Sequence, residues 1–290
     1  MRICYLILAE ERPEQLARLV ARLDGPEAAF VVHLEAKRDL AAVQRSIPPT
    51  SGELRFLDHR EVVRPGSYAA VAAALGALEF AMAEVPSGYY VLLTDLDYPI
   101  RTDQQLRDEL TSGAIYADVR PVDAQPEVQD RLDFRYRPTR TEHGLADRLV
   151  NELVLGALGR RDVARALGGR SPFVGSPWWA LPAAAAEAVL AFVAQEDEFV
   201  RFFRQTRHPE ELMVPTVIAA LPRERVIRPS LTFVHSARAA AEGGRTTLHS
   251  GDLELLRTSG RCFAHGFDAA REPEVLDLVD RTLLADLYDN

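Results

Sequence analysis

Three continuous apolar runs, separated by segments with helical periodicity, constrain the fold of this chain more than any other feature. The runs Ile3–Leu8, Ala29–Leu34 and Tyr89–Leu93 lack the alternation of a half-exposed strand, which is typical of strands covered on both faces. Between them, apolar residues recur at helical spacing after Pro13 and again from Val71 to Met82. This rhythm predicts an α/β fold with a mainly parallel central sheet and helices on both faces.

The second half of the chain is less regular. A polar stretch from Val119 to Arg148 predicts a long loop, and long loops in compact domains often bind ligands. Helices are expected over Ala183–Gln195 and from about Pro209. No linker-like composition separates two cores, so we expect one domain over residues 1–290.

The charge balance argues against a nucleic-acid partner. The chain has 34 basic and 43 acidic residues and a net charge of −9. Cys4 and Cys262 are its only cysteines, too few for a disulfide framework, which fits a reducing compartment. No apolar run reaches the ~20 residues of a membrane span, and the first residues lack signal-peptide features. With a pI of about 5.4, this predicts a cytoplasmic protein that binds no membrane.

Carboxylates follow two of the predicted strands. Glu35 comes after the second run, and Asp95 and Asp97 come after Tyr89–Leu93. Because ligands of parallel sheets bind at the carboxyl ends of strands, we expect these acids at the functional rim. An Asp-x-Asp pair on a strand points to one side and suits Mg²⁺ or Mn²⁺. Asp97 suits equally well a cap for the turn before Pro99, so both interpretations stay open.

Several motifs in a fixed order carry a resemblance to a known family. They are Val31–Lys37, Thr94–Ile100, Gly175–Leu181 (Gly-Ser-Pro-Trp-Trp-Ala-Leu), Pro209–Glu211 and Phe263–Asp268. The chain thereby resembles the core-2/I-branching β-1,6-N-acetylglucosaminyltransferase family, which includes the proteoglycan xylosyltransferases. The resemblance implies a GT-A-like fold, a nucleotide-sugar donor and an inverting transfer. It also implies a nucleotide-binding half, residues 1–118, and an acceptor-binding and catalytic half, residues 119–290.

The resemblance implies that Glu211 is the catalytic base, because the family's Pro-Asp/Glu-Glu motif has its base at the second acid. An acceptor hydroxyl must lose its proton as it attacks, so a carboxylate has to lie within hydrogen-bond reach. We expect Glu210, Trp178 and Trp179 to contact the acceptor. One tryptophan would pack in the core while the other stacks on a sugar, since strand neighbours face opposite ways. Both glutamates also suit the first turn of a helix opened by Pro209.

On the donor side, the resemblance implies that Glu35 and Asp97 contact the nucleotide sugar. The family has Ser-Gly-x-Asp-Tyr-Pro where this chain has Thr94–Pro99, and it works without a metal. We therefore expect no metal ion or other cofactor, with Asp95 and Asp97 as ligands if one binds. His33 is expected to be a core histidine, because no second histidine lies at metal-ligand spacing.

A metal-free transferase needs fixed cations beside the departing diphosphate. Arg245 matches the family's arginine, but Gly266 stands where the family has a lysine, with His265 beside it. We expect Arg245 and His265 to bind the donor. Arg135, with its neighbours in the polar stretch, is a candidate for acceptor binding, or else part of a solvated face.

These features lead to one hypothesis with two alternatives. We expect a cytoplasmic inverting transferase that moves N-acetylglucosamine from UDP-N-acetylglucosamine to a hydroxyl of a glycan or small metabolite. The first alternative is a transferase of xylose or glucose with a metal at Asp95 and Asp97. The second is a nucleotide-sugar-binding protein that lost turnover when the lysine became Gly266.

Overall fold

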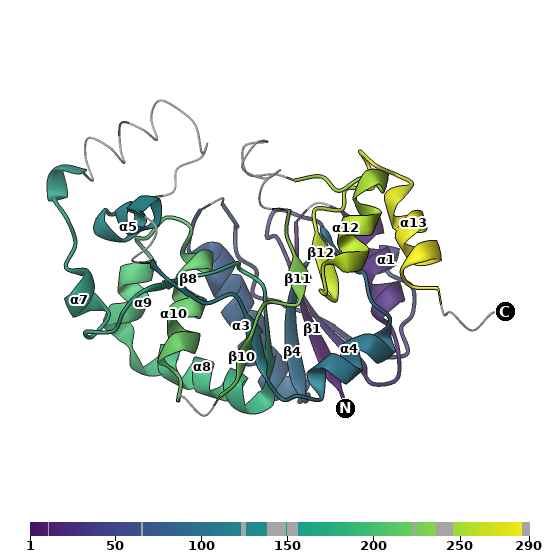
Figure 1. Ribbon diagram of the computed structural model, residues 1–290, viewed down its shortest axis with the longest axis horizontal. Coiled ribbons are helices and arrows are strands. Elements are labelled where there is room, and N and C mark those ends of the chain that lie inside the picture. The colour runs from purple at the N-terminus through teal and green to yellow at the C-terminus, as the bar shows by residue number, and fades with distance from the viewer. Residues whose placement is uncertain are drawn as a thin grey trace.

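A seven-stranded sheet lies at the centre of the computed structural model (Figure 1). The structure describes residues 1–10, 12–64, 66–122, 126–137, 149, 156–222, 225–235 and 246–285. The strand order is β10-β6-β9-β4-β1-β2-β3, and only β9 runs antiparallel to its neighbours. The predicted α/β fold with a mainly parallel sheet is confirmed. The strands are β1 (Ile3–Ala9), β2 (Ala28–Leu34), β3 (Glu53–Phe56), β4 (Tyr89–Thr94), β6 (Ile115–Ala117), β9 (Trp179–Pro182) and β10 (Ile227–Arg228).

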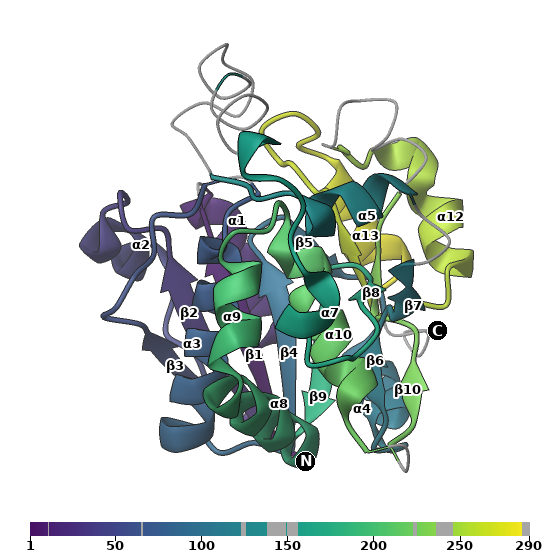
Figure 2. The same cartoon turned by 90° about the vertical axis from the view of Figure 1, so that its left-hand side faces the viewer.

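Helices cover both faces of this sheet, because alternate residues of β1 point to opposite sides. Cys4 and Leu6 belong to a core that α3, α8, α9 and α10 cover, the face that Figure 2 looks onto. Ile3, Tyr5 and Ile7 belong to a second core under α1, α4, α12 and α13. The helices are α1 (Pro13–Leu23), α2 (Leu40–Ser46), α3 (Ala69–Glu84), α4 (Asp103–Leu110), α8 (Ala183–Gln195), α9 (Asp197–Phe203), α10 (Met213–Ala220), α12 (Leu253–Thr258) and α13 (Val275–Thr282).

Strands from both predicted halves join the same sheet, since β9 and β10 lie beside β4 and β6. The division into a nucleotide-binding and a catalytic half stays a prediction. Across the described part of the chain, no helix is both long and apolar enough to pass through a bilayer.

Two local expectations differ from the structure. The helix expected from Pro209 is a 3-10 turn, Pro209–Glu211, and α10 begins only at Met213. The stretch expected to be a loop contains α5 (Pro126–Asp133), in which Val128 and Leu132, one helical turn apart, are buried. Only these two apolar residues pack this helix against the core. A pattern of two residues is too short to predict a helix from the sequence. The other short elements are β7 (Arg120–Pro121), α7 (Val163–Ala166), β8 (Phe173–Val174) and the 3-10 turns Gly156–Leu158 and Ser250–Asp252.

A small second sheet brings distant parts of the chain to the rim. It has the order β11-β12-β5, with β11 (Thr232–Phe233), β12 (Phe263–His265) and β5 (Asp97–Pro99). The antiparallel register of β12 and β5 pairs His265 with Asp97. This pairing sets the position of the candidate site, because it joins the end of β4 to the C-terminal region.

Gly175 connects the segment before β9 to the 3-10 turn. Its N–H donates to the carbonyl of Glu211 at 2.8 Å. A Cβ at position 175 would overlap with the carbonyl oxygen of Asp118 and come within 3.2 Å of Pro215. The backbone around the turn is therefore packed too closely for any side chain at this position.

We expect Gly175→Ala to lower the free energy of unfolding by about 3 kcal/mol or more, because the backbone has to move to admit the methyl group. The measurement is denaturant unfolding at equilibrium. Gly76→Ala in α3 is the matched control: its Cβ meets nothing within 4 Å, so it should gain roughly 0.5–1 kcal/mol. Equal stabilities of the two variants would contradict the close packing at Gly175.

Candidate active site

A buried carboxylate, Asp97, connects three segments at the end of β4. Its side chain is 0% exposed. One oxygen, Oδ2, accepts from the Thr94 N–H at 2.6 Å and from Trp178 Nε1 at 2.7 Å, and Oδ1 lies 2.7 Å from His265 Nδ1. An ionised carboxylate only accepts, so Nδ1 of His265 carries the proton in this pair. The Trp178 and His265 rings pack with centroids 4.5 Å apart.

The bond that Asp97 accepts from the Thr94 N–H fits the turn-capping interpretation. Because the side chain is fully buried, contact between Asp97 and a donor would run through Trp178 and His265. A direct contact of Asp97 with the donor stays a prediction.

Asp95 forms hydrogen bonds with the segment that follows β1, and not with Trp178 and His265. Its Oδ2 accepts the N–H groups of Glu10 and Arg12 at 2.9 and 3.2 Å, while Gln15 donates to its carbonyl at 2.7 Å. It is 3% exposed and fixes the loop between β1 and α1. Asp95 and Asp97 thus both accept hydrogen bonds from protein donors. Within the described ranges, no group of three or more His, Cys, Asp or Glu side chains could hold a metal ion.

Three hollows adjoin one another at the carboxyl ends of the strands. The first, about 240 Å³, is lined by residues of β1, β4, α3 and β9, and it includes both tryptophans. The second, about 230 Å³, contains Arg12 and Arg271. The third, about 210 Å³, lies between α1 and α2. Glu10 lines all three, and His265 lies in the wall that the first two share.

Glu210 and Glu211 face different surroundings. Glu210 lines the first hollow; its Oε1 lies 3.0 Å from His208 Nδ1, and its buried Oε2 has no hydrogen-bond partner among the described residues. Glu211 does not line the hollow, and its Oε2 accepts from Arg131 Nη1 at 2.8 Å. The structure thus brings Glu210, and not the expected base Glu211, into the cavity.

Arg131 forms hydrogen bonds with three residues in and beside the Pro209–Glu211 turn. Besides Glu211 it donates to the carbonyls of Arg207, at 3.1 Å, and His208, at 2.6 Å. His208 has a left-handed backbone with φ 47°, and its N–H donates to the Gly66 carbonyl. A strained residue held from two sides fixes the direction in which the following glutamates point.

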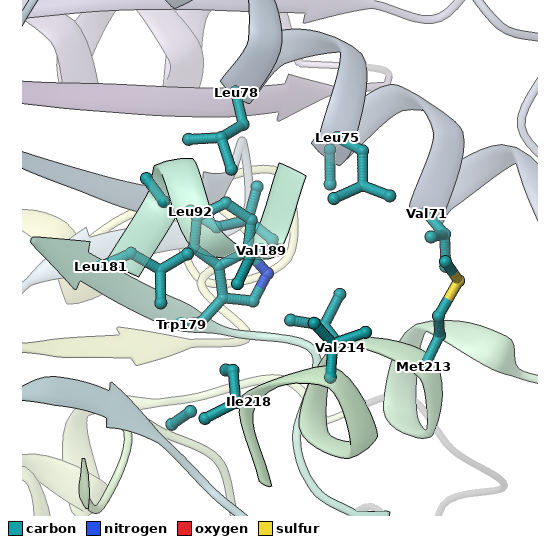
Figure 3. Packing of buried hydrophobic residues seen from close by; sticks show 14 of the residues in the cluster. Val71, Leu75, Leu78, Leu92, Trp179, Leu181, Val189, Met213, Val214 and Ile218 are labelled. Atoms are coloured by element: carbon teal, nitrogen blue, oxygen red, sulfur yellow. The ribbon is translucent and has the colours of Figure 1, made fainter. Parts of the chain in front are cut away.

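The two tryptophans are both buried, at 8% and 3% exposure for Trp178 and Trp179. Trp179 belongs to the apolar core, and Figure 3 labels it among the side chains of this cluster. Trp178 lies at the Asp97 pair instead. The geometry therefore fits a core role for Trp179 and a site role for Trp178. Contact of a tryptophan with a sugar stays a prediction.

The remaining candidates fall at the edge of this site or outside it. Glu35 is 7% exposed, and its Oε2 accepts the Lys37 N–H at 2.8 Å. Arg135 follows α5 and lines none of the three hollows. Arg245 lies outside the described residues. Their roles stay predictions.

His33 has the role of a core histidine. It is 1% exposed, and its Nε2 accepts the Glu61 N–H at 2.8 Å. Burial lowers the pKa of His33, which keeps the ring neutral and able to accept this bond.

Sequence reasoning alone does not find Arg12, Arg131 and Arg271. Arg12 follows the first strand, at the carboxyl edge of the sheet where ligands bind. Its position after a predicted strand could therefore have marked it as a candidate. Arg271 lies just beyond the motif Phe263–Asp268. Arg131 carries no local signal, because its partners are 76 to 80 residues away.

Comparisons with known proteins give one match to a protein family. The family model described as Core-2/I-Branching enzyme matches residues 3–258. A search of curated protein sequences gives no match. Mouse xyloside xylosyltransferase 1, in its apo form, is a similar solved structure, with 12% identity, a TM-score of 0.38 and coverage of 92% of this chain and 98% of the other. HddC from Yersinia pseudotuberculosis, complexed with GMP-PN, has 12% identity, a TM-score of 0.33 and coverage of 63% and 78%.

We expect truncation of the tryptophans to have different effects. Trp179→Ala should lower the free energy of unfolding by about 3–5 kcal/mol, because it leaves a cavity in the core. Trp178→Phe keeps a ring but removes the donor to Asp97, which should cost about 1.5–3 kcal/mol. Denaturant unfolding measures both.

A double-mutant cycle provides the control for Trp178. In an Asp97→Asn background the charged acceptor is gone, so Trp178→Phe should cost less, with a coupling of about 0.5–3 kcal/mol. No coupling would show that the Trp178–Asp97 bond contributes nothing to stability.

Proposed function

We propose that this chain, which belongs to the Core-2/I-Branching enzyme family and is therefore a glycosyltransferase, transfers one sugar with inversion from a nucleotide sugar to an acceptor hydroxyl. The observation that carries the proposal is the row of three adjoining hollows at the carboxyl edge of the sheet. This edge is where α/β folds bind nucleotides. UDP-N-acetylglucosamine is the donor that the resemblance favours.

The third hollow has the character of a nucleoside site. Leu16, Leu34 and Val43 give it apolar walls, and Arg38 and Asp39 lie at its edge. Ligand sites commonly combine apolar walls with a few polar groups that fix orientation. Because it shares Glu10 and Arg12 with the second hollow, a nucleotide bound here would extend its diphosphate toward the arginines.

The second hollow contains two arginines, Arg12 and Arg271, beside the carboxylates Glu10, Asp95 and Asp268. Asp268 binds Arg12 through two bonds of 2.5 and 2.8 Å, which makes Arg12 a fixed part of the wall. Arg271 lies 3.4 Å from the same carboxylate and its side chain is 67% exposed. Arg271 is therefore the cation that is able to turn toward a departing diphosphate.

The occupied carboxylates support transfer without a metal ion. Asp95 and Asp97 already accept hydrogen bonds from protein donors at the loop after β1 and at the Trp178–His265 pair. We propose that arginine side chains, and not an ion held by this acidic pair, offset the charge that builds up on the leaving group.

The Pro209–Glu211 turn supplies the base in this proposal. As the acceptor oxygen attacks the anomeric carbon, the bond from that carbon to the diphosphate breaks and the hydroxyl proton passes to a carboxylate. The resemblance assigns this carboxylate to Glu211, while Glu210 is the one that lines the cavity.

We expect a UDP-sugar to bind and to be turned over in excess EDTA. At 100 times its Kd, a bound donor should stabilise the protein by about 2.7 kcal/mol, which a thermal shift detects. The experiment compares UDP-N-acetylglucosamine, UDP-xylose and UDP-glucose, with GDP- and TDP-sugars as controls, and measures release of the nucleoside diphosphate. Loss of turnover on chelation, restored by Mn²⁺, would show that the acidic pair holds a metal.

We expect Arg271→Ala to weaken UDP binding about tenfold, or 1.4 kcal/mol, and to leave uridine binding unchanged, because only UDP presents phosphate oxygens. Calorimetric titration measures both. Arg165→Ala is the matched control: Arg165 is 77% exposed and lies 3.4 Å from Glu198, outside all three hollows. An equal loss for UDP and uridine would indicate a structural role for Arg271.

A further inference from the structure

Four exposed or half-buried arginines gather beside the Pro209–Glu211 turn, in a chain whose net charge is −9. Arg204 and Arg207 lie in the segment that follows α9. Arg135 follows α5, and Arg160 precedes α7. These three helices lie together at one end of the molecule (Figure 1). We call the four residues the arginine patch.

Hydrogen bonds join the segments that carry this patch. The Tyr136 N–H donates to the Gln205 carbonyl, and the Arg161 N–H donates to the Asp133 carbonyl, both at 2.8 Å. The side chain of Arg161 also donates to the carbonyls of Phe202, at 3.0 Å, and Gln205, at 3.3 Å. The segments after α5, before α7 and after α9 are thereby fixed to one another. The patch is built before any ligand binds, which lowers the cost of binding one.

Three of the four guanidinium groups lie over aromatic rings. The distances from guanidinium carbon to ring centroid are 5.4 Å for Arg204 over Tyr68, 5.8 Å for Arg207 over Tyr136 and 5.8 Å for Arg160 over Phe134. A guanidinium that packs on a ring keeps its in-plane N–H groups for a planar anion. A carboxylate is such an anion, and it accepts two parallel hydrogen bonds from one guanidinium.

The acids around the patch do not neutralise it. Asp133, whose side chain is 11% exposed, lies 3.3 Å from Arg160, and Glu211 pairs with Arg131. Glu210 lies beside His208. Among the described residues, no carboxylate oxygen lies within 4 Å of the guanidinium groups of the other three arginines of the patch. The surface therefore keeps a local excess of positive charge.

The patch borders the candidate active site. Arg207 lies two residues before Pro209, at the start of the turn. Tyr68, the ring beneath Arg204, directly precedes α3, whose Ala70 lines the first hollow. A chain molecule bound on the patch therefore has the carboxyl edge of the sheet beside it.

We propose that the arginine patch binds carboxylate groups of the acceptor, and that this acceptor is an anionic glycan built from uronic acid units. This inference rests on the proposed function. A uronic acid places one planar carboxylate on each sugar ring, so the guanidinium groups bind the charge while neighbouring aromatic side chains contact the sugar. A nucleic acid fits less well, because the net charge of −9 repels a densely charged polymer.

The first experiment measures binding and needs no turnover. Tetragalacturonate is the probe, and its methyl ester, which has the same skeleton without charge, is the matched control. We expect the acid to bind at least tenfold more tightly than the ester in calorimetric titration. It should lose most of this advantage when NaCl rises from about 50 mM to about 500 mM, because salt screens exposed charges.

Two results of this titration overturn the inference. Equal affinities of acid and ester would show that the patch does not recognise carboxylates. Binding of phosphatidylglycerol vesicles without binding of tetragalacturonate would assign the patch to a membrane surface.

A double variant locates the bound charge. Arg204→Gln combined with Arg207→Gln should weaken binding of tetragalacturonate about tenfold with the Kd of UDP unchanged, because two guanidinium groups are lost. Arg257→Gln combined with Arg55→Gln is the control. It removes the same charge from α12 and β3, where these side chains are 61% and 55% exposed. An equal loss in the control, or no loss in the patch variant, overturns the inference.

Turnover separates this inference from the proposed function. With the UDP-sugar that the protein binds, the variant with Arg204→Gln and Arg207→Gln should raise the KM for tetragalacturonate at least tenfold. It should leave kcat within about twofold, because the patch holds the acceptor away from the reacting bond. If N-acetyllactosamine, a neutral glycan, is glycosylated and tetragalacturonate is not, the inference is wrong and the proposed function stands. Failure to consume any nucleotide sugar overturns the proposed function and with it the acceptor role of the patch.

Discussion

The buried charge of Asp97 is the constraint on which the candidate site depends. A carboxylate with no exposure is tolerated inside a protein only when hydrogen-bond donors replace its water. Its donors come from the end of β4, from Trp178 before β9 and from His265 on β12. One side chain thus holds the central sheet, the small sheet and the cavity wall in a single arrangement. Removing one donor leaves a buried carboxylate with one hydrogen bond fewer, which is costly, so the bonds favour one arrangement of these three segments.

Most of the fold could be predicted because its signals are local. The apolar run of β1 and the helical spacing of α8 determine those elements, and α8 has the bounds Ala183–Gln195 that the sequence indicates. The small sheet could not be predicted, since β12 contains only three residues and pairs with β5 across more than 160 positions. The 3-10 turn at Pro209 depends on Arg131 and on the strained backbone of His208, and neither appears in a local pattern.

The candidate site was predictable in its residue types but not in their contacts. Motifs point to Asp97, Trp178, His265 and Glu210. The last three line one cavity, and Asp97 lies buried behind Trp178 and His265. The sequence does not indicate which of the two glutamates faces that cavity. In a tight turn, the side chains of adjacent residues point in different directions, and a small change in backbone angles decides which one points inward. The ion pair of Glu211 with Arg131 selects the orientation, and that pair spans 80 residues.

Position 266 does not admit the lysine that the resemblance to the family implies there. Gly266 has φ 109°, a conformation that side chains rarely adopt, and a Cβ there would overlap with the carbonyl oxygen of Thr246. A lysine is therefore excluded by the backbone itself, and simple reversion at this site would disrupt the end of β12. The same residue lines the hollow that contains Arg12 and Arg271. Arg12, from the loop after β1, and Arg271, from the C-terminal region, are therefore the cations that this hollow offers in place of a lysine at position 266.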